Sequence, residues 1–153
     1  MTSIIIPSHI QYPKRPFGTR NGRDCVLPVL GFPSVALARM ADTEQAAANE
    51  AVRHAVEDLG IRYFDVAPEY GDGVAQERLG LGPALQPYQS QVFLAAKTMY
   101  RDSKGAAADL EATLTALQTD VLDLYQFHSI STEEDVRRIF SAGGAMETFV
   151  AAK

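Results

Sequence analysis

The sequence predicts an α/β fold built around a parallel β-sheet. Three short apolar segments, 61–65, 92–97 and 121–128, have the length and the β-branched or aromatic content of buried strands. Amphipathic helical patterns separate them, and strands that alternate with helices form βαβ units with parallel strands. Each segment also ends in a residue that can carry charge or transfer a proton, which places a candidate site at the carboxyl end of the sheet.

The first part of the chain precedes this alternation. Residues 1–16 contain three prolines and no helical or alternating period, so we expect an irregular N-terminal arm. An Asn-Gly dipeptide within 17–27 is a strong turn signal and predicts a short β-hairpin. Residues 29–31 are expected to form a brief strand, and residues 32–34 a loop.

The first long helix is predicted to begin at Asp42 or Thr43. Asp42 and Gln45 have the spacing of a capping box, and an apolar stripe follows them at helical spacing. Gly60 is well placed as the C-terminal stop of this helix, and the buried strand 61–65 follows directly.

The later elements alternate in the same way, with ordinary capping and breaking signals. Asp102 and Ser103 can cap a helix, and Ser131 with Glu134 forms a capping box for a short one that two glycines then end. The predicted elements are a helix over 76–85, a strand over 92–97, a helix from 103, a strand over 121–128, a short helix from 132 and a helix over 145–153.

Composition restricts the classes of function. The chain has 153 residues, 46% of them hydrophobic, and a net charge of -5, which favours one domain and gives no sign of a nucleic-acid surface. The four basic residues before position 24 are expected to form a solvated arm, with a nucleic-acid or anionic-lipid contact as the alternative. Cys25 is the only cysteine, which indicates a reducing compartment, and no apolar run approaches the roughly 18 residues of a membrane span. We therefore expect a cytoplasmic protein with no nucleic-acid or membrane partner.

Four residues form the candidate site. Asp65, Lys97 and His128 each end a predicted strand, and Tyr70 follows Asp65 by five positions in a glycine-containing loop. Neighbouring strands lie about 4.7–4.9 Å apart, so side chains at their ends can meet. An ammonium group favours the phenolate form of a nearby tyrosine, a carboxylate holds the lysine, and a neutral imidazole can orient a substrate oxygen. Such a cluster can protonate an alkoxide or deprotonate an alcohol, and it lacks the spacing of metal ligands, so no metal is expected.

Each of these residues taken alone also has a purely structural interpretation. The aspartate can cap a turn, the tyrosine can be a half-exposed loop aromatic, the lysine can extend its amine from a strand end, and the histidine can be buried and satisfied. Glu69 and Asp72, which flank Tyr70, could tune the site, but a solvated loop is favoured. The joint occurrence of the four residues is what favours a site.

Three segments resemble motifs of one known family. Residues 60–71, followed by the run Glu-Arg-Leu-Gly at 77–80, resemble the signature segment of the aldo-keto reductases; 92–98 resembles the lysine strand of that family and 123–129 its histidine strand. The resemblance covers roughly residues 26–153. It implies a TIM (β/α)8 barrel, of which residues 17–153 would form the N-terminal half: about four βα units with a short N-terminal hairpin. The family barrel takes about 250 residues, so the chain resembles a truncated member.

The resemblance also implies an activity. It is reversible hydride transfer between NADP, or alternatively NAD, and an aldehyde or ketone such as a sugar or another small carbonyl compound. By motif, Tyr70 would be the general acid, Lys97 the group that tunes it, Asp65 the partner of the lysine and His128 the group that orients the carbonyl.

Cofactor contacts are expected at Gly31, Ser34, Asp65 and Ser129. The short chain leaves two alternatives open: a non-enzymatic half-barrel that serves as an interaction module, and a half-barrel that is active only as a dimer. Exposed sheet edges favour self-association in either case.

Overall fold

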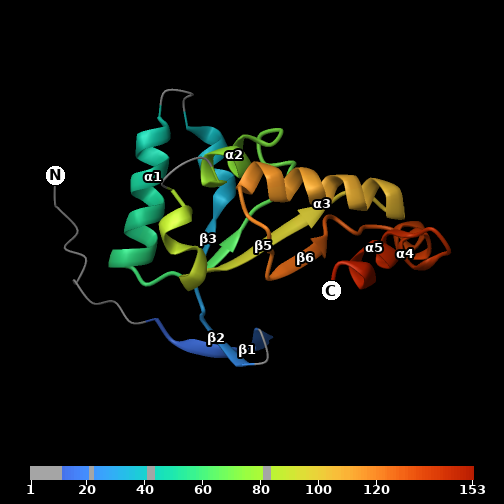
Figure 1. Ribbon diagram of the computed structural model, residues 1–153, viewed down its shortest axis with the longest axis horizontal. Helices are drawn as coiled ribbons and strands as arrows, with labels where there is room; N and C mark the ends of the chain where they lie inside the picture. Colours follow the sequence, from blue (N-terminus) through green and yellow to red (C-terminus); the bar gives the residue numbers. More distant parts are fainter. Residues whose placement is uncertain (1–11, 21–22, 41–43, 81–83) are drawn as a thin grey trace.

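The computed structural model describes residues 12–20, 23–40, 44–80 and 84–153, and its centre is a four-stranded parallel sheet (Figure 1). The strands are β3 (Gly31–Pro33), β4 (Tyr63–Asp65), β5 (Phe93–Thr98) and β6 (Leu124–Phe127), in that spatial order. The predicted α/β class and parallel sheet are confirmed. Within the described sheet β3 and β6 are both edge strands, as expected for part of a barrel.

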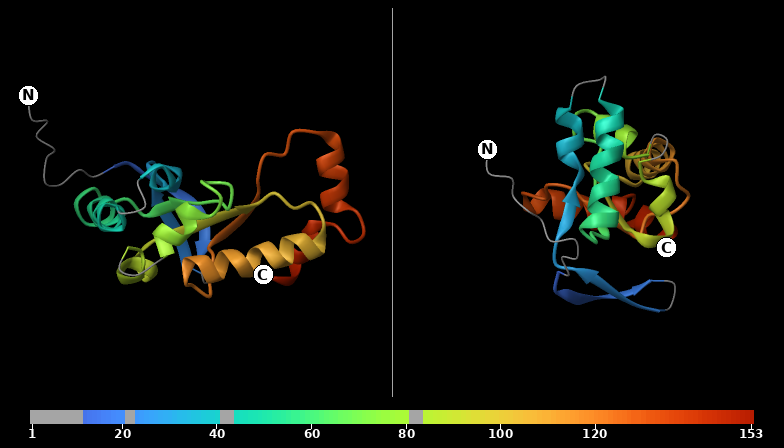
Figure 2. Two further views of the ribbon diagram at one scale, coloured as in Figure 1. Left: turned by 90° about the horizontal axis from the view of Figure 1, so that it is seen from above. Right: turned by 90° about the vertical axis from the view of Figure 1, so that its left-hand side faces the viewer.

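The predicted hairpin is present as β1 (Lys14–Arg20) paired antiparallel with β2 (Arg23–Pro28). It begins at Lys14, so residues 14–16 belong to the hairpin and not to the arm; the Asn-Gly turn lies outside the described residues. The hairpin occupies one end of the molecule, apart from the helices (Figures 1 and 2). The ring of Phe17 lies 5.8 Å from that of Tyr63 and 5.0 Å from that of Phe93, so the hairpin covers the amino ends of β4 and β5.

The first parallel strand lies two residues later than predicted. Phe32 and Pro33, expected in a loop, belong to β3, and a short 3-10 helix, η1 (Ser34–Arg39), follows at once. The ring of Phe32 stacks on that of Phe64 at 5.0 Å, which supplies the packing that favours a strand here. Proline is tolerated because β3 is an edge strand and needs no further ladder donor.

The helix that follows is α1 (Gln45–Arg53), continued by a π-helical turn, η2 (His54–Asp58). The predicted cap at positions 42–43 lies outside the described residues. Gly60 follows the end of this helical segment, as predicted, and its φ of +66° is the left-handed conformation typical of a helix stop. The next helix, α2 (Val74–Gly80), begins two residues earlier than predicted, and η3 (Gln86–Gln91) leads into β5.

The long helix α3 (Ser103–Leu117) is capped as predicted: the Asp102 carboxylate accepts a hydrogen bond from the Gly105 amide at 2.8 Å. The capping box of α4 (Glu133–Phe140) is shifted by one residue from its predicted place. Thr132 and Asp135 form it. The Thr132 hydroxyl accepts a hydrogen bond from the Asp135 amide at 3.0 Å, and the Asp135 carboxylate accepts one from the Thr132 amide at 3.1 Å. The last helix is α5 (Ala145–Ala151), which packs against α3 and α4 (Figure 2).

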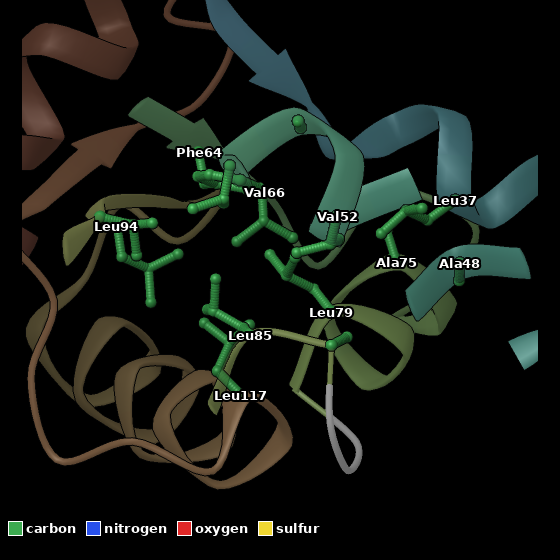
Figure 3. Close-up of a cluster of buried hydrophobic side chains, with 14 of the residues drawn as sticks. Leu37, Ala48, Val52, Phe64, Val66, Ala75, Leu79, Leu85, Leu94 and Leu117 are labelled. Atoms are coloured by element: carbon green, nitrogen blue, oxygen red, sulfur yellow. The ribbon is translucent and has the colours of Figure 1, made fainter. Parts of the chain in front are cut away.

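The hydrophobic core lies between the sheet and helices α1, α2 and α3 (Figure 3). Each large aliphatic side chain buried there stabilises the fold by about 1.5–3 kcal/mol. Gly80 brings α2 against the backbone of α3, where a Cβ atom would overlap Ala116 and Leu117. Among the described residues, the helices are too short or too polar to span a bilayer. The labelled core residues in Figure 3 include Leu37, Val52, Phe64, Val66, Leu79, Leu85, Leu94 and Leu117.

Candidate active site

Three of the four predicted catalytic side chains meet at the carboxyl ends of β4 and β5. The Lys97 ammonium donates to Asp65 Oδ2 at 2.6 Å and lies 3.0 Å from the Tyr70 hydroxyl. The Tyr70 hydroxyl in turn donates to the same Asp65 oxygen at 3.2 Å. The ammonium, phenol and carboxylate groups therefore form one closed triangle of hydrogen bonds.

Strand register and a tight loop create this meeting. Asp65 pairs with Ala95 in the sheet, so Lys97, two residues further on, lies on the same side of β5 just beyond it. Tyr70 is returned to the strand end by a turn in which Gly71 and Gly73 have φ values of +68° and +92°. A Cβ atom on Gly71 would lie 2.6 Å from the Ala38 methyl group, so this turn requires glycine.

The environment keeps Lys97 charged. Its side chain is 13% exposed and that of Asp65 is 28% exposed. Burial lowers the pKa of Lys97, but the hydrogen bonds and charges of Asp65 and Tyr70 outweigh it, so the pKa stands above its ordinary value. The ammonium also lies 4.9 Å from the centre of the Tyr70 ring. A positive charge is thus fixed beside the phenol at neutral pH.

His128 completes the group from the end of β6. Its ring lies 5.9 Å from the Tyr70 ring at an angle of 87°, an edge contact. Its backbone amide donates to Thr98 O at 2.9 Å, which fixes the strand end. Its Nδ1 atom lies 2.8 Å from a carboxylate oxygen of Glu69. Glu69 is exposed, as expected, and it also pairs with a candidate catalytic residue, which agrees with the alternative that it tunes the site.

Arg101 is a second residue that sequence reasoning missed. Its guanidinium group is almost completely buried and donates to the carbonyl oxygens of His128 at 2.7 Å and Ser129 at 3.2 Å. It also donates to Met99 O at 2.9 Å and pairs with Asp135 at 3.0 Å. Arg101 therefore ties the loop after β5 to the loop after β6. Its position four residues after Lys97 is the only signal in the sequence that pointed to this rim.

The predicted cofactor contacts are spread more widely. Gly31 lies at the start of β3, where a Cβ atom would be 2.9 Å from the Tyr63 ring, two residues before the strand end. Ser34 is buried, and its hydroxyl has no hydrogen-bond partner among the described residues. Ser129 is exposed in a left-handed conformation with a φ of +52°. Only Asp65 belongs to the triangle, and all four cofactor contacts stay predictions.

The arrangement is suited to proton transfer at an oxygen atom. It holds one phenolic proton donor beside a fixed ammonium group, with an imidazole against the phenol ring. Within the described ranges no cluster of three or more His, Cys, Asp or Glu side chains could hold a metal ion.

Known proteins share both the sequence pattern and the fold. The sequence model of the aldo/keto reductase family matches residues 30–152. The chain is 33% identical over 120 residues to aldo-keto reductase YhdN of Bacillus subtilis, covering 66% of this chain and 35% of that protein. It is 35% identical over 115 residues to methylglyoxal reductase YeaE of Escherichia coli, covering 72% of this chain and 37% of that protein.

A solved structure supports the same relationship. The crystal structure of an aldo/keto reductase from Klebsiella pneumoniae in complex with NADP and acetate matches with a TM-score of 0.61 and 27% identity, over 82% of this chain and 42% of that one. The chain thus spans less than half the length of these relatives. The matched residues include all four side chains of the candidate site, and the chain belongs to the aldo/keto reductase family.

Proposed function

We propose that this chain contributes the acid–base centre of an NADP-dependent oxidoreductase that interconverts small aldehydes or ketones and their alcohols. One observation carries the proposal: Lys97 bonds the Asp65 carboxylate and the Tyr70 hydroxyl at the same time, at the carboxyl end of a parallel sheet. Barrels of this class place their chemistry at that end.

Tyr70 is the proton donor in the reductive direction. As negative charge develops on the carbonyl oxygen, the Tyr70 hydroxyl gives its proton to that oxygen, and the product is an alcohol. The phenolate that remains is stabilised by the Lys97 ammonium at 3.0 Å. In the oxidative direction the same phenolate takes the proton of the alcohol. General acid catalysis of this kind contributes about 10²–10⁴-fold to a rate.

Asp65 and His128 position the reacting groups. The Asp65 carboxylate holds Lys97 at 2.6 Å and so fixes the charge beside the phenol. His128, whose ring edge contacts Tyr70, orients the substrate oxygen toward the phenolic proton by a hydrogen bond. Both roles agree with the partly buried positions of these side chains.

The site has groups that fit the reactive end of a nicotinamide cofactor, which supplies the hydride for the carbonyl carbon when bound. Asp65 uses one carboxylate oxygen for Lys97 and Tyr70 and is 28% exposed, so its other oxygen can accept from a ribose hydroxyl. Gly31, Ser34 and Ser129 are proposed as further contacts. NADP is preferred because the Klebsiella pneumoniae relative binds it, and NAD is the alternative.

The substrate is proposed to be a small carbonyl compound. The relative named methylglyoxal reductase is 35% identical to this chain, which makes a short aldehyde the first choice, with sugars as the second. We further propose a cytoplasmic location, on the single cysteine and the absence of a long apolar run from the sequence.

A non-enzymatic interaction module is the second candidate function. The two edge strands of the described sheet and the exposed side chains of Met99, Tyr100 and Ile130 at or near the rim favour it. Self-association through these edges is the form of interaction we propose to test.

The test uses the protein expressed from its complete open reading frame. NADPH binding is followed by fluorescence titration, and turnover of methylglyoxal and a panel of aldehydes by loss of NADPH absorbance. Saturable binding with turnover is expected. Saturable binding without turnover of any aldehyde would count against the assignment, and no binding together with a stable dimer in size-exclusion chromatography would favour the interaction module.

A further inference from the structure

We infer that Glu69 fixes the tautomer of His128, so that only the imidazolium form can donate a hydrogen bond to a carbonyl substrate. This inference rests on the proposed function for its kinetic consequence and on geometry alone for the tautomer. Glu69 is a positioning residue in this account, because it acts through His128 and does not contact the substrate.

The contact is short and is held on both sides. Glu69 Oε2 lies 2.8 Å from His128 Nδ1, with side-chain exposures of 37% for Glu69 and 20% for His128. The Glu69 backbone precedes Tyr70, whose amide donates to Ala67 O at 3.1 Å. The His128 backbone is fixed by Arg101.

Other charges surround the pair. Lys97 and Asp65 lie behind the Tyr70 ring that contacts His128, and Arg101 lies on its backbone side, paired with Asp135. Asp109 and Tyr125 are close enough to Glu69 for their pKa values to be raised, chiefly by burial and in part by its charge. The titratable and charged groups that face the pair are therefore Asp65, Tyr70, Lys97, Arg101, Asp109, Tyr125 and Asp135.

An ionised carboxylate can only accept hydrogen bonds, so Nδ1 of His128 must carry the hydrogen. In the neutral imidazole the other nitrogen, Nε2, then has a lone pair and no hydrogen. Neutral His128 in this tautomer cannot donate a hydrogen bond to a carbonyl oxygen. Only the imidazolium keeps the bond to Glu69 and also offers an Nε2 hydrogen to a carbonyl.

This changes the role expected from the sequence. A neutral histidine was expected to orient the carbonyl, which requires the hydrogen on Nε2. With Glu69 on Nδ1 that tautomer loses its charge-assisted hydrogen bond. Carbonyl reduction therefore uses the imidazolium form of His128, in place of the neutral form that was expected.

The test is nuclear magnetic resonance of the protein with ¹⁵N-labelled histidine, in which imidazole nitrogen shifts report tautomer and charge directly. His54 serves as an internal reference, because its Nδ1 lies 2.6 Å from an Asp58 carboxylate oxygen, and a His54→Gln variant assigns its signals. Neutral His128 should be mainly the Nδ1–H tautomer. Glu69→Ala should raise the share of Nε2–H by about fivefold or more, the effect of losing a partly exposed charge-assisted bond.

Two variants control this measurement. Asp72→Asn removes a charge from the same loop at a left-handed position that asparagine tolerates, and it should leave the His128 tautomer unchanged. Glu69→Gln keeps the side-chain shape and should give a tautomer ratio between those of wild type and Glu69→Ala. It replaces Glu69→Ala in the test if that variant does not fold. Nε2–H as the main neutral tautomer with Glu69 intact, or no change in Glu69→Ala, would overturn the inference.

The kinetic consequence is read separately. If the protein turns over, its rate of carbonyl reduction should follow the fraction of protonated His128 given by the same titration, and Glu69→Ala should weaken that dependence. A rate that stays constant while His128 titrates overturns the inference and leaves the proposed function standing. Absence of turnover refutes the proposed function and leaves the tautomer result readable.

Discussion

Replacing Arg101 by methionine tests how the two rim loops are held together. Methionine fills a similar volume but has no donors. The change removes hydrogen bonds to the carbonyl oxygens of Met99, His128 and Ser129 and the ion pair with Asp135. Because the Arg101 side chain is 6% exposed, water cannot fully replace these bonds.

The expected loss follows from these contacts. A hydrogen bond to a charged group contributes about 1.5–3 kcal/mol, and three carbonyl oxygens accept such bonds from Arg101. The contributions are not additive, so we expect the free energy of unfolding to fall by about 3–5 kcal/mol. That is a large share of the roughly 5–15 kcal/mol by which a domain is stable.

Urea denaturation followed by circular dichroism measures this loss. With a slope of about 2 kcal/mol per M, the midpoint should fall by roughly 2 M. Arg137→Met is the matched control, because Arg137 pairs with Glu134 at 3.3 Å on the exposed surface of α4. The control should change stability by less than about 0.5 kcal/mol. A loss for Arg101→Met no larger than for this control would refute the reasoning.

Three further predictions concern packing and pH. Gly80→Ala should destabilise the fold by about 1–3 kcal/mol, because the added methyl group meets the α3 backbone at Ala116; a thermal melt equal to that of wild type would contradict it. The folded pKa of Lys97 is raised, so its stabilisation should be complete below the unfolded value of about 10.4 and lost as pH rises above it. The difference in free energy of unfolding between wild type and Lys97→Met should therefore not change with pH near neutrality. It should shrink only at alkaline pH. Hydrogen bonding, chiefly with Arg101, lowers the pKa of Asp135 to about 2, so the advantage of wild type over Asp135→Asn should hold above about pH 4 and close as pH falls toward 2.

The sequence was sufficient for the parts of the fold that local patterns determine. The Asp102 cap and the helix stop at Gly60 are local features, and both were found where predicted. The α4 cap was shifted because Ser131 and Thr132 both have an acid three residues later. Thr132 is the cap in the structure because its partner Asp135 is also held by Arg101, a contact over 34 positions.

In the candidate site, too, local patterns predicted some residues, and contacts between distant parts of the chain determined the rest. Asp65, Lys97 and His128 could be predicted because parallel strands bring their carboxyl ends together, and Tyr70 because a glycine turn follows Asp65. The pairing of Glu69 with His128 could not be predicted, since it joins residues 59 positions apart and depends on how far the loop after β4 reaches over the sheet. Charge in a loop is ordinarily solvated, and only the folded chain shows its partner.

The central claim is that Tyr70 is the proton donor of a carbonyl reductase. The most direct test is the rate of NADPH-dependent aldehyde reduction by the protein from the complete open reading frame, compared with its Tyr70→Phe variant. The variant keeps the ring that contacts His128 and loses only the hydroxyl bonded to Lys97 and Asp65. We predict a fall in kcat of about 100-fold or more with NADPH binding retained. Equal turnover by the variant and the wild type would contradict the claim.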